Sequence, residues 1–318
     1  MRAFPALLLL GLALTVPAHC FFTTTWAGEA LTTNQLADSL SVVDTDAMTA
    51  VADVKLSGKP AGIALSPDKR VAYVSAPEGQ ELIEVDIVGR AVTRRLKLGG
   101  GPLGIAAHPA RAEVYVADWY AHKISVIDVL TLKVAAEIPV GQSPSGLAVS
   151  PDGTRMISAD RDSDQISIID LAKRAVIATI ATGKRPFGVT IDAEGRTAYT
   201  ANVASNDVSV IDIASQKVVR TIKVGQRPYA IALAAGRGFV TDQYTGTVTV
   251  FKAATGAVER TLEACDHPEG IEASADESNL YVACWGDNIV LKIDAKTLQI
   301  MAKASVGDGP RSFGKFLR

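Results

Sequence analysis

Histidine and cysteine are scarce in this chain, which has four histidines and three cysteines among its 318 residues. It contains no Cys-x-x-Cys-His sequence, and this absence excludes covalently attached haem. No His-Glu-x-x-His sequence, phosphate-binding loop or Gly-x-Ser-x-Gly sequence occurs either. The sequence therefore gives no support to a metalloprotease, a nucleotide-binding enzyme or a hydrolase with a nucleophile elbow.

A strong charge of either sign is also lacking. The 32 lysines and arginines oppose 34 aspartates and glutamates, which gives a formal net charge of −2. Because there is no overall basic field, general attraction to nucleic acid or to an acidic membrane surface is not predicted.

A long apolar run is found only at the N-terminus. Arg2 precedes the apolar residues 6–16, and Pro17 and Ala18 follow them, which is typical of a secretory signal peptide. The run is shorter than the roughly 20 residues of a membrane span, so a retained anchor is the weaker alternative. We expect a signal peptide over residues 1–18, a short lead over residues 19–28, and a periplasmic or secreted protein without a membrane span. Cys20 would then remain in the mature protein as a third cysteine without a partner.

Prolines recur at a fixed period through the rest of the chain. The landmark prolines are Pro60, Pro102, Pro144, Pro186, Pro228, Pro268 and Pro310, spaced by 42 residues except for one spacing of 40. Most units read Gly-x-x-Pro, an apolar stretch, a turn, an aromatic strand, a polar loop, Val-x-Val-Ile-Asp, a turn and a last apolar strand. Four short strands in such a period are the signature of a β-propeller blade. We name these strands A to D.

Counting the units predicts the number of blades. Six complete units run from Pro60 to just before Pro310, and the two chain ends supply a seventh. Residues 29–34, 40–43 and 50–56 match strands B, C and D, whereas residues 310–316 match the missing strand A. We therefore predict an all-β, seven-bladed propeller of four-stranded antiparallel blades as a single domain over residues 29–318. A C-terminal inner strand would close it by pairing with the N-terminal outer strands.

The strand-B segments carry a family resemblance. Tyr73-Val74-Ser75, Tyr115-Val116-Ala117, Tyr199-Thr200-Ala201-Asn202 and Tyr281-Val282-Ala283 resemble the Tyr-Val-Thr-Asn element of the YVTN-repeat family. The resemblance implies an exported bacterial propeller. Similar propellers occur in periplasmic proteins, archaeal surface-layer proteins and proteins encoded near quinoprotein or cytochrome systems. Because fold does not imply function, the resemblance leaves open a binding or scaffolding protein and, as the alternative, a lactonase-like hydrolase or an accessory protein of such a system.

An aspartate closes strand C in most units. These residues are Asp44, Asp86, Asp128, Asp170, Asp212 and Asp294. A carboxylate repeated in this way is expected to accept hydrogen bonds from the backbone of the next turn rather than to bind metal or act in catalysis.

One face of the ring is the expected binding face. In a four-stranded meander the B–C and D–A connections share a face, and here their residues vary between units. Exposed Trp, Tyr and Arg on this loop face are the residue types enriched in binding hot spots. The residue after each landmark proline is expected at the mouth of the central channel, namely Ala61, Leu103, Ser145, Phe187, Tyr229, Glu269 and Arg311. The predicted ligand- or partner-binding residues are Trp119, Tyr120, His122, Asp160, Arg161, Arg185, Phe187, Asn202, Arg227, Tyr229, Asp242, Tyr244, Glu269, Trp285 and Arg311.

The chemistry of the partner stays open between a protein, a cell-surface polymer and a small ligand. No cofactor is expected, no catalytic residue is assigned, and nucleic acid is a weaker prediction that rests on loop lysines and arginines. An enzyme would need a convergent set of carboxylates, for which Asp160, Asp162, Asp242 and Glu269 are the candidates.

Cys265 and Cys284 fall in the same unit, before strand A and at the end of strand B. We expect a disulfide between them in an oxidising compartment, with roughly 3 kcal/mol of stabilisation from closing the loop. A metal site formed by both cysteines and His267 is the alternative.

Overall fold

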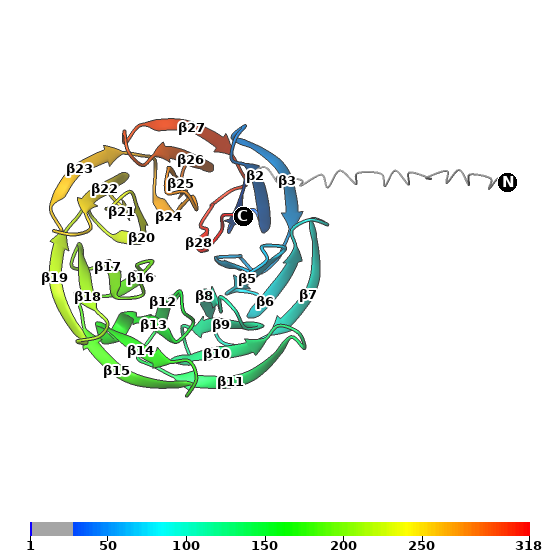
Figure 1. The fold of residues 1–318 in the computed structure, drawn as a ribbon, viewed down its shortest axis with the longest axis horizontal. Helices are drawn as coiled ribbons and strands as arrows, with labels where there is room; N and C mark the ends of the chain where they lie inside the picture. The colour runs from blue at the N-terminus through cyan, green and yellow to red at the C-terminus, as the bar shows by residue number, and fades with distance from the viewer. Residues whose placement is uncertain (2–27) are drawn as a thin grey trace.

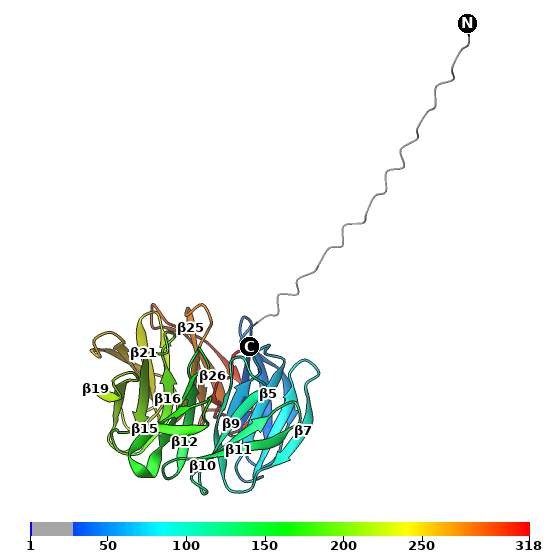
Figure 2. The same cartoon turned by 60° about the horizontal axis from the view of Figure 1, so that its bottom comes forward.

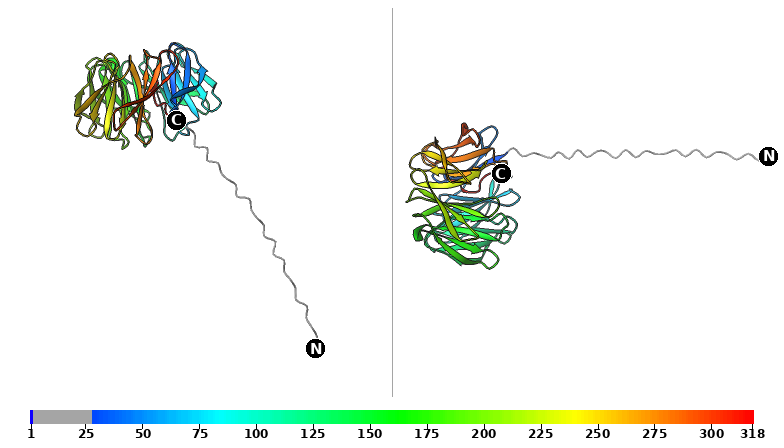
Figure 3. Two further views of the ribbon diagram at one scale, coloured as in Figure 1. Left: turned by 90° about the horizontal axis from the view of Figure 1, so that it is seen from above. Right: turned by 60° about the vertical axis from the view of Figure 1, so that its left-hand side comes forward.

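The chain forms seven antiparallel sheets arranged as a ring around a central axis (Figure 1). The computed structural model describes Met1 and residues 28–318, so the expected signal peptide lies outside the described residues. Figure 2 shows the sheets standing side by side, and Figure 3 shows the ring from its edge. The predicted seven-bladed propeller is confirmed.

The strands follow the repeat closely. Blade 1 contains β4 (Gly62–Leu65), β5 (Val71–Ala76), β6 (Glu81–Asp86) and β7 (Ala91–Lys97). Blade 2 contains β8 (Pro102–Ala107), β9 (Glu113–Asp118), β10 (Lys123–Asp128) and β11 (Lys133–Pro139). Blade 3 contains β12 (Pro144–Val149), β13 (Arg155–Asp160), a 3₁₀ turn η1 (Arg161–Ser163), β14 (Gln165–Asp170) and β15 (Ala175–Ala181).

The second half of the ring repeats this order. Blade 4 contains β16 (Pro186–Ile191), β17 (Thr197–Asn202), β18 (Asp207–Asp212) and β19 (Lys217–Lys223). Blade 5 contains β20 (Pro228–Ala234), β21 (Arg237–Asp242), β22 (Thr247–Lys252) and β23 (Val258–Glu263). Blade 6 contains β24 (Pro268–Ala273), β25 (Asn279–Cys284), β26 (Ile289–Asp294) and β27 (Ile300–Ser305). Blade 7 joins β1 (Glu29–Asn34), β2 (Ser39–Asp44) and β3 (Thr49–Lys55) to the C-terminal segment with β28 (Phe313–Gly314).

Burial explains why each unit becomes a blade. Strands B and C are buried along almost their whole length, as in β5 and β6, because blades on both sides cover them. The outer strand D alternates between exposed and half-buried residues, as in β7. Among the described residues no helix is long and apolar enough to cross a membrane.

The inner strands approach each other closely at one position of the repeat. A Cβ atom on Gly104 would lie 1.6 Å from the carbonyl oxygen of Ser145, and one on Gly188 would lie 2.3 Å from that of Tyr229. A glycine two residues after the landmark proline therefore lets neighbouring backbones meet near the axis.

The aspartates that close strand C cap turns, as predicted. Asp128 is typical: its Oδ1 accepts hydrogen bonds from the backbone N–H groups of Leu130 at 2.9 Å and Thr131 at 3.0 Å. The five other members each accept at least one N–H from the following turn.

The C-terminal segment closes the ring against β1. Pro310 pairs with Asn34 and Leu317 with Ala30 in antiparallel bridges. Between these bridges the segment advances seven residues while β1 advances four, so it bulges more than the inner strands of the other blades. Its middle, β28, pairs in parallel with β4 of blade 1. The predicted closure is therefore confirmed, with the difference that one segment joins two blades.

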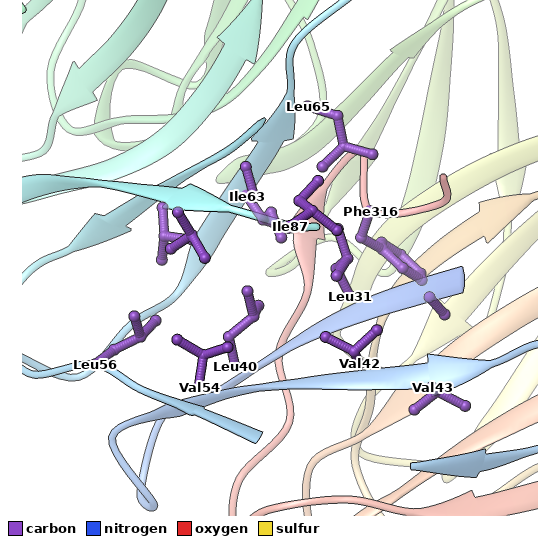
Figure 4. Packing of buried hydrophobic residues seen from close by; sticks show 14 of the residues in the cluster. Leu31, Leu40, Val42, Val43, Val54, Leu56, Ile63, Leu65, Ile87 and Phe316 are labelled. Atoms are coloured by element: carbon purple, nitrogen blue, oxygen red, sulfur yellow. The ribbon is translucent and has the colours of Figure 1, made fainter. Parts of the chain in front are cut away.

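The closure is held by an apolar side chain and a carboxylate. Phe316 is fully buried in the same cluster as Leu31, Ile63 and Leu65 (Figure 4). Glu272 of β24, itself buried, accepts hydrogen bonds from the backbone N–H groups of Phe316 and, at 2.8 Å, Leu317.

We predict that Glu272→Ala weakens the closure and that Glu272→Gln largely preserves it. Alanine leaves two N–H groups without their acceptor, which costs about 2–4 kcal/mol of unfolding free energy. Glutamine keeps a carbonyl oxygen that accepts both. Urea denaturation measures the loss, and hydrogen exchange at residues 311–318 locates it. Equal stability of the alanine variant and the wild type would contradict this role.

Candidate binding vestibule on the loop face

A hollow of about 430 Å³ opens at the centre of the loop face. Every lining residue lies in a B–C or D–A connection or directly follows a landmark proline. The lining consists of Gln35, Lys59, Pro77, Glu78, Gly101, Leu103, Trp119, Tyr120, Arg161, Phe187, Arg227, Tyr229, Gln243 and Arg311. We call this hollow the vestibule.

Three aromatic rings close the floor of the vestibule. The ring centroids of Phe187 and Tyr229 lie 4.7 Å apart, and Phe313 of β28 lies 4.9 Å from Phe187 and 5.4 Å from Tyr229. Trp119 continues this apolar surface up the wall, with its ring 6.4 Å from Phe187. We call Phe187, Tyr229 and Phe313 the aromatic plug.

An apolar channel lies on the other side of the aromatic plug. It has a volume of about 230 Å³ and is lined mainly by inner-strand residues such as Ile105, Leu147, Val189 and Ile231. Phe313 lines this channel, whereas Phe187 and Tyr229 line the vestibule. The plug thus separates the vestibule, whose lining includes five charged residues, from a channel lined mainly by inner-strand residues.

A buried ion pair anchors the floor. Nε of Arg311 donates to Oε2 of Glu269 at 2.8 Å, and the Arg311 guanidinium also donates to the hydroxyl of Tyr229. Burial disfavours the charge on Arg311, but the negative charge of Glu269, the interaction with Tyr229 and the hydrogen bonds to both together outweigh this effect and raise the pKa of the guanidinium. For Tyr229, burial disfavours the charged phenolate and so raises the pKa, and the hydroxyl stays protonated.

The ion pair extends by hydrogen bonds towards the wall. Nε2 of Gln243 donates to Oε1 of Glu269 at 2.6 Å, and Oε1 of Gln243 accepts from Nε of Arg227 at 2.6 Å. The guanidinium of Arg227 lies over the ring of Tyr244, 4.9 Å from its centroid. The closing segment and blades 5 and 6 are thereby linked through one chain of polar side chains.

A second arginine lies on an aromatic ring across the vestibule. The guanidinium of Arg161 is 5.1 Å from the ring centroid of Trp119 and donates to Oδ1 of Asp162 at 2.7 Å. Burial lowers the pKa of Arg161; Asp162 opposes this shift, and the positive charges of Arg185 and Arg227 add to it. Arg185 and Arg227 are therefore each close enough to repel Arg161.

Some predicted site residues lie beside the vestibule rather than in it. Tyr244, His267 and Trp285 form an aromatic row with successive centroid distances of 6.0 Å. Arg185 is exposed near Asp162. His122 accepts a hydrogen bond from the backbone N–H of Ser143 and holds a turn.

Three predicted ligand residues need correction, because Asp160, Asn202 and Asp242 are completely buried. Each ends strand B and bonds to the Ser or Thr seven residues later on strand C. Oδ2 of Asp160 accepts from Ser167 at 2.6 Å, and that of Asp242 from Thr249 at 2.6 Å. Nδ2 of Asn202 donates to Oδ1 of Asp207 and Oγ of Ser209 on strand C of the same blade. These residues tie strand B to strand C within one blade, and a ligand does not reach them.

A glycine of the D–A loop completes this arrangement. The N–H of Gly141 donates to Asp160 at 3.0 Å, and Cβ atoms on Gly183 and Gly225 would lie within 2.6 Å of Asn202 and Asp242. Two features of the sequence indicate that Asp160, Asn202 and Asp242 are structural. One is the Ser or Thr seven residues later on strand C, and the other is the glycine three residues before the landmark proline.

The disulfide occupies this same position in blade 6. Cys265 stands where five other blades have a glycine, and Cys284 stands where those blades have Asp or Asn; blade 1 has Ser57 and Ala76 at these positions. Their Sγ atoms are bonded and their Cα atoms lie 5.9 Å apart. The disulfide replaces the polar contact between the D–A loop and strand B that blades such as blade 3 have. Because both sulfur atoms are bonded to each other, they are not free to bind a metal ion together with His267. No His, Cys, Asp and Glu group of the described residues could hold a metal ion.

The four candidate catalytic carboxylates do not line the vestibule. Asp160 and Asp242 are structural, Glu269 lies in its ion pair, and Asp162 binds Arg161. Glu78 is the single carboxylate of the lining. Several lining residues were not among the predicted binding residues, although each lies in a B–C or D–A connection: Gln35, Lys59, Pro77, Glu78, Gly101 and Gln243.

Fold and site together define a seven-bladed β-propeller with a vestibule on its loop face. A family model described as YNCE-like beta-propeller matches residues 105–196. Comparison with curated protein sequences gives no match.

Two solved structures share the fold. Hydrazine synthase of Kuenenia stuttgartiensis superposes with a TM-score of 0.76 at 19% identity over 82% of this chain and 90% of that chain. A functionally unknown protein from Desulfotomaculum acetoxidans DSM 771 gives a TM-score of 0.74 at 14% identity over 89% of this chain and 99% of that chain. At these identities the similarity establishes the architecture and no activity.

We predict that Asp242→Asn removes a pH dependence of stability. Burial raises the pKa of Asp242 from 3.8 to about 6, so the folded protein binds a proton that the unfolded chain releases. Its contribution to stability is present below about pH 4 and is lost as pH rises to about 6. Relative to wild type, the variant should gain about 2–3 kcal/mol between pH 4 and 7, measured by urea denaturation.

Asp128→Asn is the matched control. Backbone hydrogen bonds from Thr131 and Leu130 lower the pKa of Asp128, so its contribution is present above its unfolded pKa and lost as pH falls. This variant should change relative to wild type in the opposite direction. A shift of the same sign in both variants would contradict the assignment for Asp242.

We predict that reduction of Cys265–Cys284 lowers the free energy of unfolding by about 3 kcal/mol, the value for a closed loop of this length. The double variant Cys265→Ser/Cys284→Ser should show the lower stability with or without reductant. Denaturation with and without a thiol-free phosphine measures both. A wild type insensitive to the reductant under denaturing conditions would contradict the prediction.

Proposed function

We propose that this chain is a non-enzymatic binding propeller that recognises a protein, a surface polymer or a small ligand through its loop face. The observation that carries the proposal is the vestibule of about 430 Å³, a size in the range of ligand pockets. Its lining combines aromatic rings with arginines, the residue types that dominate binding energetics. The closed ring holds these side chains in place, so little ordering is needed on binding.

A propeller enzyme has less support. Acid–base catalysis needs ionisable groups within reach of the same substrate atom. The vestibule has one carboxylate, Glu78, and the carboxylates around it are used in structural bonds. The arginines and aromatic rings suit recognition without chemistry.

The proposal includes export to the periplasm or the exterior and membership of the YVTN-repeat family. The apolar N-terminal run supports export, and a disulfide is compatible with an oxidising compartment. The Tyr-Val elements of strand B support the family.

We predict that the triple variant Trp119→Ala/Tyr244→Ala/Arg227→Ala loses most of the material that wild type captures from the periplasmic or secreted fraction. The three side chains present the arginine and the rings of the loop face, and each change is expected to leave the blade cores intact. Affinity capture with quantitative mass analysis measures the loss.

The control is Leu130→Ala/Lys173→Ala/Arg196→Ala, in exposed turns of the opposite face. It should capture as wild type does. Capture by the loop-face variant at the wild-type level, with thermal unfolding unchanged, would refute the proposal.

A further inference from the structure

The vestibule has a local excess of positive charge in a chain whose net charge is −2. Lys59, Arg161, Arg227 and Arg311 line it, against Glu78 alone. Such a concentration in a concave site creates a potential that attracts anions. Whether the vestibule favours an anionic ligand therefore depends on which of these charges are already neutralised.

Three of the four cations have carboxylate partners. Arg311 pairs with buried Glu269, Lys59 with Asp38 at 2.9 Å, and Arg161 with Asp162 at 2.7 Å. These ion pairs largely neutralise the three cations, and they hold the walls of the vestibule in place.

Arg227 differs from the other three. Within residues 28–318 no carboxylate lies at ion-pair distance from it, and its Nε donates to the neutral amide oxygen of Gln243. Its remaining guanidinium N–H groups donate to none of these residues. Because Gln243 and the ring of Tyr244 hold the guanidinium, its free donors are oriented before any ligand arrives.

The rest of the lining selects a flat apolar group. Trp119, Phe187 and Tyr229 form a continuous aromatic surface, and Leu103 lines the same hollow. The aromatic plug ends this surface at the floor, which limits the depth a ligand can reach. A planar body can stack here while its charged end stays near the wall.

We propose that the vestibule binds a small ligand that joins a flat apolar group to a carboxylate or phosphate, with the anion on Arg227. This inference rests on the proposed function and specifies the ligand class of that site. A bidentate contact between a guanidinium and an oxyanion is the strong, planar form of recognition. A ligand of this class fills about 430 Å³ more completely than a free anion does.

The test is isothermal titration of the purified protein with 2-naphthoate and with uncharged 2-naphthalenemethanol. Naphthoate should bind at least about tenfold more tightly, the effect of one charge-assisted hydrogen bond of moderate strength. Arg227→Gln should abolish this preference while binding of the alcohol is unchanged. Trp119→Ala should weaken both probes. Added salt should reduce the preference in wild type.

Arg260→Gln, on the exposed outer strand β23, is the matched control and should behave as wild type. Naphthyl phosphate in place of naphthoate distinguishes phosphate from carboxylate as the anionic end. Equal affinity for the charged and uncharged probes, no binding of either, or a preference that survives in Arg227→Gln would overturn the inference. Tighter binding of a single-stranded oligonucleotide than of naphthoate would also overturn it, since the ligand would then be a polymer.

Failure of this inference is distinguishable from failure of the proposed function. If the naphthyl probes do not discriminate but the loop-face triple variant still loses capture, the face binds a partner of another chemistry. If capture is insensitive to the triple variant, the binding function itself fails.

Discussion

The contact between neighbouring inner strands is the constraint on which the rest of this propeller depends. At Gly104, Gly188 and their equivalents the backbone of one blade lies where a side chain would otherwise stand. Because the blades meet so near the axis, the residues that precede this small-residue position of each repeat are brought into one small ring. Phe187, Tyr229 and Arg311 become neighbours although more than one hundred residues separate the first from the last. The vestibule floor is a consequence of how narrowly the ring closes.

The same crowding explains the placement of charge. A buried ion pair such as Arg311–Glu269 is costly to desolvate and is maintained here by additional bonds to Tyr229 and Gln243. It ties the closing segment to blade 6 near the mouth of the channel, while Glu272 ties that segment at a second point. Closure of the ring and formation of the vestibule floor are therefore both carried out by the C-terminal segment.

The sequence predicted the architecture because a propeller repeats its turns, and turns are the part of a chain with the most local chemistry. It also placed Phe187 and Tyr229 at the mouth of the channel from their position after the landmark prolines, but it did not mark Phe313. It failed for Asp160, Asn202 and Asp242, since a polar residue at the end of a strand has the same local pattern whether it faces solvent or a hidden serine. The outcome is decided by a partner seven residues later and a glycine about twenty residues earlier. Which arginine keeps a free charge could not be predicted either, because it depends on cross-blade neighbours such as Gln243.

The disulfide of blade 6 shows that the contact between strand B and the D–A loop can be a covalent bond or a polar contact at the same positions of the repeat. In blades 3, 4, 5 and 7 the same contact is made by a Gly with an Asp or Asn, as in Gly141–Asp160 and Gly183–Asn202. Each such pair occupies the repeat positions at which blade 6 holds Cys265 and Cys284 with their Cα atoms 5.9 Å apart, a separation suited to a disulfide. Several blades therefore have an equivalent position between strand B and the D–A loop. Exchanging one residue pair at such a position for two cysteines would move the disulfide to another blade without altering the loop face.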